Sequence, residues 1–412
     1  MKIFSIETSC DETAAAILEF DSNGKFKLLA NQVASQIKIH AKWGGIVPNL
    51  AAREHTKNIL PIIKETFKEA NLKPENIDLF CVTEGPGLIP ALLIGVNNIK
   101  TLSYFYQKPL TGVHHIEGHI YSNFIDKDDR GNLGITSLSK VRGKTEQHNE
   151  IYSGINKASS GDFDKEICQT RNSCKFEFPI LNLVISGGHT QLILMKNHLE
   201  YEIIGQTQDD AVGEAFDKVA KMMGFEYPGG PIISDQANQA EKLILNKKID
   251  KKYLKIKFPR PMMHSPNLNF SFSGLKTAVL YFYQKLEKQK LPEKEMPIWK
   301  KFISKAFQDA VMEVLQNKTL KAIETYKPKT VLLSGGVSAN NKILETLQER
   351  LATDYPQIIF NSPEKKFCGD NATMIGIVGI IKYLKSTKKE QSVFDSNWKN
   401  LEANSNLKID AE

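Results

Sequence analysis

The 412-residue chain is 41% hydrophobic and 25% charged, which is typical of a soluble globular protein and, at this length, of two domains rather than one. Five scattered cysteines without CxxC spacing argue against a disulfide framework and against a thiolate zinc site. We find no secretory signal and no membrane-spanning run, so we expect a cytoplasmic protein without a membrane partner. The net charge of +7 suits a polyanionic partner but is mild for this length.

The first predicted elements are two strands joined by a small polar turn, in IFSIETSCDETAAAILEF at residues 3–20. Residues 78–102, DLFCVTEGPGLIPALLIGVNNIKTL, predict a buried strand, a Gly-Pro-Gly turn and a helix. Strands that alternate with helices indicate an α/β protein with parallel strand pairing.

The next stretch, GVHHIEGHIYS at residues 112–122, is rich in histidine. On a helix, His115 and His119 are four residues apart and share a face, so both imidazoles can reach one metal ion. A helix with incidental solvated histidines is the alternative. A zinc-protease motif is excluded, because Glu117 lies about 200° around the helix from His115, where it cannot hold the attacking water.

Residues 126–178 interrupt the α/β pattern. They are polar and lack hydrophobic periodicity, so we predict a flexible insertion, which contains His148, Cys168 and Cys174. The polar C-terminal segment 386–412 is interpreted in the same way, as a tail.

Two later stretches repeat the strand-turn design of the N-terminus. Residues 181–195 hold the turn Ser186-Gly187-Gly188, and residues 330–347 hold the turn at 334–336, which runs into a helix. Such glycine turns let the backbone approach phosphate oxygens, although a simple turn is the alternative. No P-loop and no GxGxxG fingerprint is present, so a nucleotide would have to lie between two duplicated lobes.

Two carboxylates on predicted helices have both a structural and a functional interpretation. Spacing alone favours an ion pair of Asp217 with Lys221 over contact with ligand hydroxyls. Asp370 stands at the start of an apolar helix, where a carboxylate can cap the helix, serve as the third metal ligand, or do both.

Ten blocks in one order resemble the tRNA N6-adenosine threonylcarbamoyltransferase family, once described as O-sialoglycoprotein endopeptidases. The resemblance covers residues 1 to about 125 and 179 to about 385. The blocks are IETSCDET, WGGIVPNLAAREH, TEGPGL, HHIEGH, VISGGHTQL, GEAFDKVAK, YPGGP, FSFSGLKT, SGGVSAN and the Asp-Asn pair at 370–371.

The resemblance implies an actin/hexokinase-like α/β fold, in which two lobes with duplicated sheet cores enclose a nucleotide cleft. The N-terminal lobe with the metal-binding helix would span 1–125, and the C-terminal lobe with the substrate loops 179–369. The flexible insertion separates the lobes, a helix at 370–385 carries a metal ligand, and the polar tail follows.

The resemblance also implies the site. One iron or zinc ion would be bound by His115, His119 and Asp370, and ATP or threonylcarbamoyl-adenylate would lie in the cleft. The implied substrate-binding residues are Val184, Ile185, Ser186, Gly187, Gly188, Asp217, Gly230 and Asn340. The candidates for the group that accepts the proton of the attacking amine are Asp11, Glu12 and His189.

The implied reaction transfers a threonylcarbamoyl group to N6 of the adenosine that follows the anticodon, in tRNAs that read codons starting with A. Besides tRNA, the implied partners are a threonylcarbamoyl-adenylate synthase, a paralogous inactive subunit and a small P-loop ATPase. The alternatives are a metal-dependent glycoprotein endopeptidase, disfavoured by the displaced glutamate, and a non-catalytic nucleotide-binding scaffold, disfavoured by the complete set of metal ligands.

Two departures from the family pattern stand out. Gly369 replaces the Thr or Ser that usually precedes the Asp-Asn pair, which removes a hydroxyl beside a metal ligand. The insertion at 126–178 is longer than the family usually shows.

Overall fold

The structure is a computed structural model of the chain and describes residues 1–21, 26–127, 133–135, 176–246, 249–289 and 291–410. Most of the predicted flexible insertion, including His148, Cys168 and Cys174, lies outside the described residues. At its edges, β6 (Ile125–Lys127) and β7 (Leu133–Ile135) form a short antiparallel pair.

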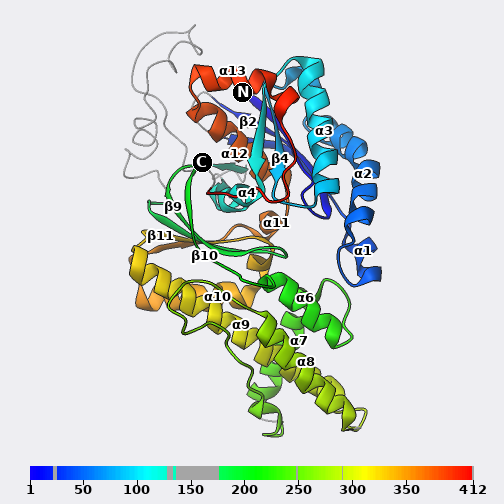
Figure 1. Ribbon diagram of the computed structural model, residues 1–412, viewed down its shortest axis with the longest axis vertical. Coiled ribbons are helices and arrows are strands. Elements are labelled where there is room, and N and C mark those ends of the chain that lie inside the picture. The colour runs from blue at the N-terminus through cyan, green and yellow to red at the C-terminus, as the bar shows by residue number, and fades with distance from the viewer. Residues whose placement is uncertain (22–25, 128–132, 136–175, 247–248, 290, 411–412) are drawn as a thin grey trace.

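The first lobe is built on a five-stranded sheet with strand order β3-β2-β1-β4-β5 (Figure 1). The first three strands in sequence pair antiparallel, and the other two continue the sheet in parallel. The strands are β1 (Lys2–Glu7), β2 (Glu12–Phe20), β3 (Phe26–Ser35), β4 (Leu79–Gly85) and β5 (Leu110–His114).

The second lobe repeats this topology in a sheet with strand order β10-β9-β8-β11-β12. Its strands also pair as three antiparallel and two parallel members. The duplication predicted from the strand-turn-strand stretches is therefore confirmed. The strands are β8 (Ile180–Ile185), β9 (Thr190–Asn197), β10 (Glu200–Gln206), β11 (Thr330–Ser334) and β12 (Ile359–Asn361).

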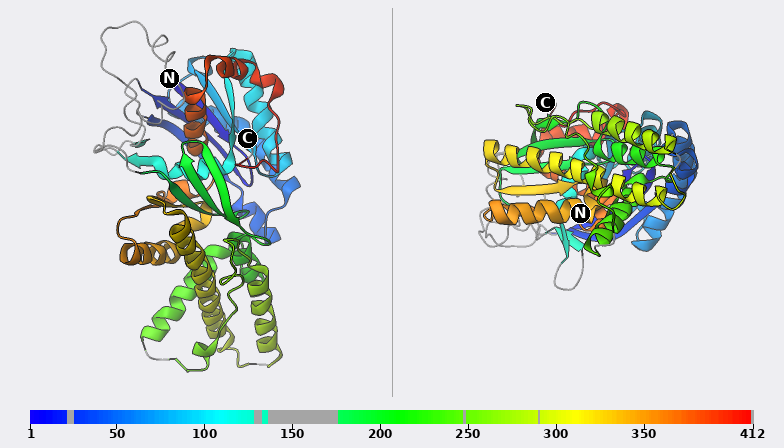
Figure 2. Two further views of the ribbon diagram at one scale, coloured as in Figure 1. Left: turned by 60° about the vertical axis from the view of Figure 1, so that its left-hand side comes forward. Right: turned by 90° about the horizontal axis from the view of Figure 1, so that it is seen from below.

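Helices lie between the sheets and on both outer faces, which gives the two-lobed α/β fold with duplicated sheet cores that was predicted (Figure 2). Helices α4 (His115–Tyr121) and α12 (Ala372–Lys385) share a buried core with strands of both sheets. The outer face of the first sheet packs against α2 (Pro48–Glu69) and α3 (Ile89–Tyr106). The second sheet is covered by α6 (Val212–Met222), α7 (Gly229–Leu245), α8 (Ser273–Lys288), α9 (Met296–Tyr326) and α10 (Asn341–Asp354).

Helix α12 is apolar on all sides because it is buried on all sides. Ten consecutive residues at its start are buried. Its glycines let the helix approach the first sheet closely: a Cβ atom on Gly379 would lie 2.2 Å from the sulfur of Cys81, and one on Gly376 would lie 2.4 Å from a methyl carbon of Leu18. None of the helices in the described ranges combines the length and apolarity needed to cross a bilayer.

The C-terminal segment that was interpreted as a tail is instead ordered in the structure. It forms helix α13 (Lys388–Asn400), which begins with a reciprocal capping box between Thr387 and Glu390. Leu401 is buried, and its carbonyl accepts a hydrogen bond from Nζ of Lys100 over 2.8 Å. The interpretation was wrong because a few apolar anchors and a good cap are enough to dock a segment that is otherwise polar.

His198, in the turn between β9 and β10, is a buried histidine that was not predicted as a site residue. It is 2% exposed, and its Nδ1 lies 2.9 Å from the hydroxyl of Tyr121. Burial, assisted by the neighbouring Lys385, lowers the pKa of His198 to about 3. The ring is therefore neutral in the folded protein at pH values where an unfolded histidine is already protonated.

We expect this histidine to make the fold acid-sensitive. Between about pH 6.5 and pH 3 the unfolded chain binds a proton that folded His198 does not, so the free energy of unfolding falls as the pH is lowered. One proton corresponds to a slope of about 1.4 kcal/mol per pH unit. Urea unfolding of wild type and His198→Phe across this range should show a shallower slope for the variant. Parallel curves would contradict the assignment.

Candidate active site

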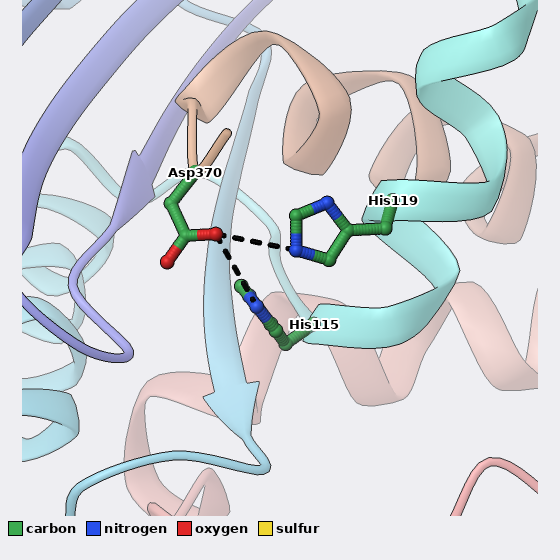
Figure 3. A group of neighbouring side chains, drawn as sticks. All are labelled: His115, His119 and Asp370. Carbon is green, nitrogen blue, oxygen red and sulfur yellow. Dashed lines mark ion pairs between the residues drawn. The ribbon is translucent and has the colours of Figure 1, made fainter. Parts of the chain in front are cut away.

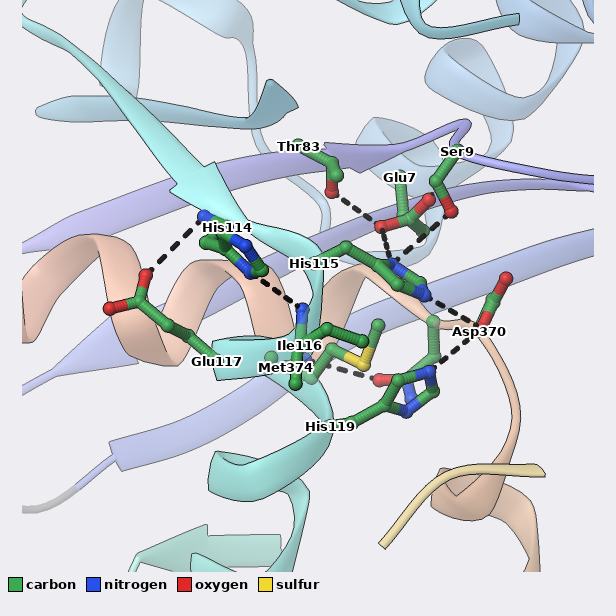
Figure 4. Close-up of polar contacts among 12 residues, drawn as sticks. Glu7, Ser9, Thr83, His114, His115, Ile116, Glu117, His119, Asp370 and Met374 are labelled. Atoms are coloured by element: carbon green, nitrogen blue, oxygen red, sulfur yellow. Dashed lines mark hydrogen bonds and ion pairs between the residues drawn. The ribbon is translucent and has the colours of Figure 1, made fainter. Parts of the chain in front are cut away.

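Helix α4 is capped by residues of its own histidine motif (Figure 4). The Ile116 amide donates to Nδ1 of His114 over 3.1 Å, and the His114 amide donates to the carboxylate of Glu117 over 3.3 Å. Because Nδ1 is an acceptor, Nε2 of His114 donates to the carbonyl of Leu407, 3.0 Å away. Burial lowers the pKa of His114 to about 3, which agrees with a neutral ring. His114 is thus a helix cap.

The other two histidines of the motif point toward Asp370 (Figure 3). Oδ1 of Asp370 lies 3.5 Å from Nε2 of His115 and 3.2 Å from Nε2 of His119. Each of the three side chains offers one potential ligand atom, and these three atoms lie within 4.8 Å of one another. The structure therefore brings together the three residues that the sequence predicted as metal ligands.

Asp370 is free for this role because its neighbour caps α12. The N-cap is Asn371, whose side-chain oxygen accepts a hydrogen bond from the Met374 amide over 3.1 Å. The capping role considered for Asp370 is therefore wrong. A Cβ atom on Gly369 would meet no other atom within 4 Å, and φ is −80°, so the hydroxyl residue usual in the family would fit here.

The buried carboxylate of Glu7 contacts His115 at Nδ1, the ring nitrogen that does not face Asp370 (Figure 4). Its Oε2 lies 3.1 Å from Nδ1 of His115 and accepts a hydrogen bond from the Thr83 hydroxyl, while Oε1 accepts one from the Ser9 amide. Burial opposes ionisation of Glu7, but His115 holds its pKa below the usual value. Burial opposes protonation of His115, but Asp370 and Glu7 raise its pKa to about 9. The hydrogen bond to Glu7 can hold one proton on Nδ1, so Nε2, the nitrogen on the Asp370 side, is the one that can exchange its proton for a metal ion. Sequence reasoning missed Glu7, although it ends a predicted buried strand, where a carboxylate is unusual.

The chemistry of this cluster fits a divalent metal ion. Two imidazole nitrogens and one carboxylate oxygen are ligands that suit iron and zinc. Both ring nitrogens of His119 are buried and form no hydrogen bond with any described residue, and the contact of Nε2 with Asp370 is an ion pair only if the ring is protonated. A metal ion at Nε2 would give the neutral ring a partner. Although burial opposes ionisation of Asp370, His115 and His119 hold its pKa well below the usual value.

The predicted substrate loop at 186–188 lies between two close backbone contacts. The Gly213 amide, at the start of α6, donates to the carbonyl of the loop serine over 3.2 Å. On the other side, Gly335 has a φ of +89°, and a Cβ atom there would lie 2.4 Å from the carbonyl oxygen of Ile185. The side chains of Val184 and Ile185 are fully buried, so these two residues can offer a ligand only their main-chain groups.

His189 follows this loop and lies close enough to the metal cluster to interact with it electrostatically. Burial, together with His115 and His119, lowers the pKa of His189 to about 4. Its imidazole is therefore neutral at physiological pH and can accept a proton.

Asp11, in the turn after β1, and Glu12, the first residue of β2, form a carboxylate pair. Burial raises the pKa of both, and the neighbouring Asp11 adds to the rise at Glu12, whose pKa reaches about 10. The turn is held by His55, a residue that sequence reasoning missed: its ring nitrogens lie 2.8 Å from the Thr13 hydroxyl and 3.1 Å from the Cys10 carbonyl.

The ion pair favoured for Asp217 is absent from the described structure. Oδ1 of Asp217 instead accepts a hydrogen bond from the Gly229 amide over 2.7 Å, at the start of α7. Lys221 turns to the first lobe, where its Nζ donates to the carbonyl of Gly44 over 3.5 Å. Burial raises the pKa of Asp217, and hydrogen bonds from the amides of Gly229 and Gly230 offset part of that rise. The local spacing rule failed because a backbone amide distant in sequence was the better partner.

Asn340 has a structural role in the described contacts. Its side-chain oxygen caps α10 by accepting hydrogen bonds from the amides of Lys342 and Ile343, and its side-chain nitrogen donates to Gln308 over 3.2 Å. Among the described residues, no hydrogen bond or ion pair joins Asn340 to the metal-ligand cluster.

The sequence is similar to known proteins over nearly its whole length. A family described as tRNA N6-adenosine threonylcarbamoyltransferase matches residues 27–135 and 166–377. A protein with that name from Listeria monocytogenes serotype 4b (strain CLIP80459) is 38% identical over 96% of this chain and 94% of its own.

Relatives from other bacteria carry the same name. The protein from Thermosipho africanus is 40% identical over 99% of this chain and 100% of its own, and that from Bacillus subtilis is 39% identical over 94% and 92%. The chain therefore belongs to the tRNA N6-adenosine threonylcarbamoyltransferase family.

Proposed function

We propose that the protein transfers a threonylcarbamoyl group from threonylcarbamoyl-adenylate to N6 of the adenosine that follows the anticodon, in tRNAs that read codons beginning with A. The observation that carries this proposal is the convergence of His115, His119 and Asp370 near His189, the residue that follows the glycine loop, in a chain of this family. The position of Glu117, which faces away from the cluster, argues against a peptidase of the zinc-protease type.

The reaction is an acyl transfer. N6 attacks the carbamoyl carbon, a carbon–nitrogen bond forms, and the bond from that carbon to the phosphate oxygen breaks. AMP leaves with the bonding electrons, and N6 loses a proton. Iron or zinc, bound by the three ligands, would act as a Lewis acid that stabilises negative charge on the phosphate.

The residues of this chain can supply the remaining requirements. Main-chain amides of the loop at 186–188 are suited to donate to the developing oxyanion or the phosphate. His189 is neutral and able to accept the N6 proton. Glu12 is the least suited of the three candidate bases, because its raised pKa keeps it protonated at neutral pH.

We further propose that turnover depends on a synthase that supplies threonylcarbamoyl-adenylate, a paralogous inactive subunit and a small P-loop ATPase. Support for this dependence comes from the family resemblance and from the lack of a P-loop motif in the sequence.

The function is tested in a strain that lacks its own transferase. Expression of the wild-type protein should restore threonylcarbamoyladenosine, detected by mass spectrometry of tRNA nucleosides. If the strain's partner proteins do not support the enzyme, the reaction reconstituted with the cognate synthase, paralogue and ATPase decides. Absence of the modified nucleoside in both systems would refute the function, and turnover with the synthase alone would refute the need for partners.

Glu7→Gln is expected to weaken metal binding without unfolding the protein. The amide cannot fix the proton on Nδ1 of His115 as a carboxylate does, and loss of such a supporting group lowers metal affinity about 10- to 100-fold. Competition with a chelator measures this affinity, and thermal unfolding of the metal-free protein reports on the fold. Thr83→Val, which removes a donor to Glu7 but keeps the carboxylate, serves as the matched control with a smaller effect. Unchanged affinity in Glu7→Gln would rule out this supporting role.

A further inference from the structure

A short helical segment of the first lobe reaches from the Asp11 turn to the second lobe. It consists of α1 (Ile37–His40) and a 3-10 turn at Ala41–Trp43. Just before it, the Gln36 amide donates to the carbonyl of Asp11 over 3.0 Å. Just after it, the carbonyl of Gly44 accepts the hydrogen bond from Lys221 of α6. Figure 1 shows α1 at the edge of the first lobe that faces α6.

This segment presents Trp43 to solvent on a backbone that is held in place. The side chain of Trp43 is 65% exposed, whereas Trp299 is buried. Gly44 ends the turn in the left-handed conformation, with a φ of +66°. Beneath the turn, the fully buried His40 accepts a hydrogen bond from the Val47 amide over 3.3 Å. Exposure alone does not distinguish this indole, because Phe105 and Tyr281 are at least as exposed. Its position on an anchored turn between exposed lysines does distinguish it.

Three exposed lysines lie on this segment or contact it. Lys38 and Lys42 are exposed on the same segment, and exposed Lys221 contacts it from the second lobe. Over the described ranges, no ion pair joins any of these three amines to a carboxylate. The carboxylates of Asp11 and Glu12 lie farther in, at the turn to which the segment is bonded. The outer surface of the segment is therefore basic and aromatic.

We propose that Trp43, Lys38, Lys42 and Lys221 form the surface that docks the anticodon loop of the substrate tRNA. The indole stacks on an unpaired base near the target adenosine, and the amines contact the flanking phosphates. This inference rests on the proposed function, because it concerns the same reaction. Single-stranded RNA is bound in this way, by stacking on aromatic side chains combined with contacts from cationic groups.

The reach of the segment agrees with this placement. The seven residues of helical and 3-10 backbone, 37–43, span about 10–14 Å. At roughly 3.4 Å per stacked base, this equals three or four nucleotides. The Asp11 turn lies close enough to the metal-ligand cluster for Asp11 and Asp370 to interact electrostatically. A base stacked on Trp43 would therefore belong to the same loop as an adenosine bound between this turn and the cluster. Unpaired amines around the indole favour RNA over a protein partner as the occupant.

Trp43→Ala tests the stacking contact in the reconstituted transfer reaction. We expect the KM for tRNA and the Kd from filter binding to rise about 5- to 100-fold, with the KM for threonylcarbamoyl-adenylate and the metal content unchanged. Trp43→Phe should recover most of the affinity. Tyr281→Ala, which removes a 66% exposed aromatic side chain on α8, serves as the matched control and should leave tRNA affinity unchanged.

The lysines are tested through salt dependence. If each amine binds one phosphate, Lys42→Ala and Lys221→Ala should each reduce the slope of log affinity against log salt by about 0.7. Unaltered tRNA affinity in Trp43→Ala would overturn the proposal. A variant that keeps its tRNA affinity but no longer assembles with the partner subunit would also overturn it, because the surface would then bind protein. If wild-type protein failed to modify tRNA at all, the proposed function would fail instead, so the two failures are distinguishable.

Discussion

Replacing His119 by alanine is expected to abolish metal binding and to reduce transfer to tRNA by about 100-fold or more, with the fold retained. The ring faces Asp370 at 3.2 Å, and neither of its nitrogens forms a hydrogen bond with any described residue, so the fold loses no internal hydrogen bond. The reaction loses the ion, whose stabilisation of the leaving phosphate is worth several kcal/mol. Elemental analysis, nucleoside analysis of tRNA and circular dichroism measure the three effects.

His114→Asn is the matched control for this experiment. His114 stands in the same motif but caps α4, and asparagine is also a good cap. This variant should therefore keep its metal and most of its activity. Normal transfer by a metal-free His115→Ala/His119→Ala double variant would overturn the assignment of the site.

The metal-ligand cluster shows how far the sequence alone reaches. The helical spacing of His115 and His119 is a local signal and predicted a shared face correctly. Asp370 is distant in sequence, so only the family resemblance connected it with the histidines. Glu7 was missed because no local pattern separates a buried supporting carboxylate from an ordinary turn residue at a strand end.

The duplicated sheets were predictable for a related reason. Each lobe begins with apolar runs joined by a small polar or glycine turn, and such runs form buried strands whatever surrounds them. Partner choice was harder to predict. Asp217 bonds to the Gly229 amide rather than to Lys221, and the polar C-terminal segment docks through Leu401; both depend on contacts that only the complete fold creates.

A buried ion pair joins α12 to α4, the helix that carries the two histidine ligands, and we expect its loss to destabilise the fold strongly. Nζ of Lys382, on α12, lies 2.7 Å from Oε2 of Glu117, on α4, and the side chains are 25% and 7% exposed. Burial alone would lower the pKa of Lys382, but Glu117 raises it, so the lysine stays charged. Lys382→Met should reduce the free energy of unfolding by about 3–5 kcal/mol, because it leaves a buried carboxylate without its partner.

The double variant Glu117→Leu/Lys382→Met separates the charge pair from the packing around it. Removing both charges should restore much of the stability lost in Lys382→Met, so urea unfolding of wild type, both single variants and the double variant should give strong coupling. Purely additive losses would contradict a coupled pair. Because α4 supplies both histidine ligands and α12 begins just after Asp370, metal affinity should fall in Lys382→Met and recover in the double variant, as the stability does. The glutamate of the histidine motif then contributes by joining the two helices that carry the ligands, without contacting the metal itself.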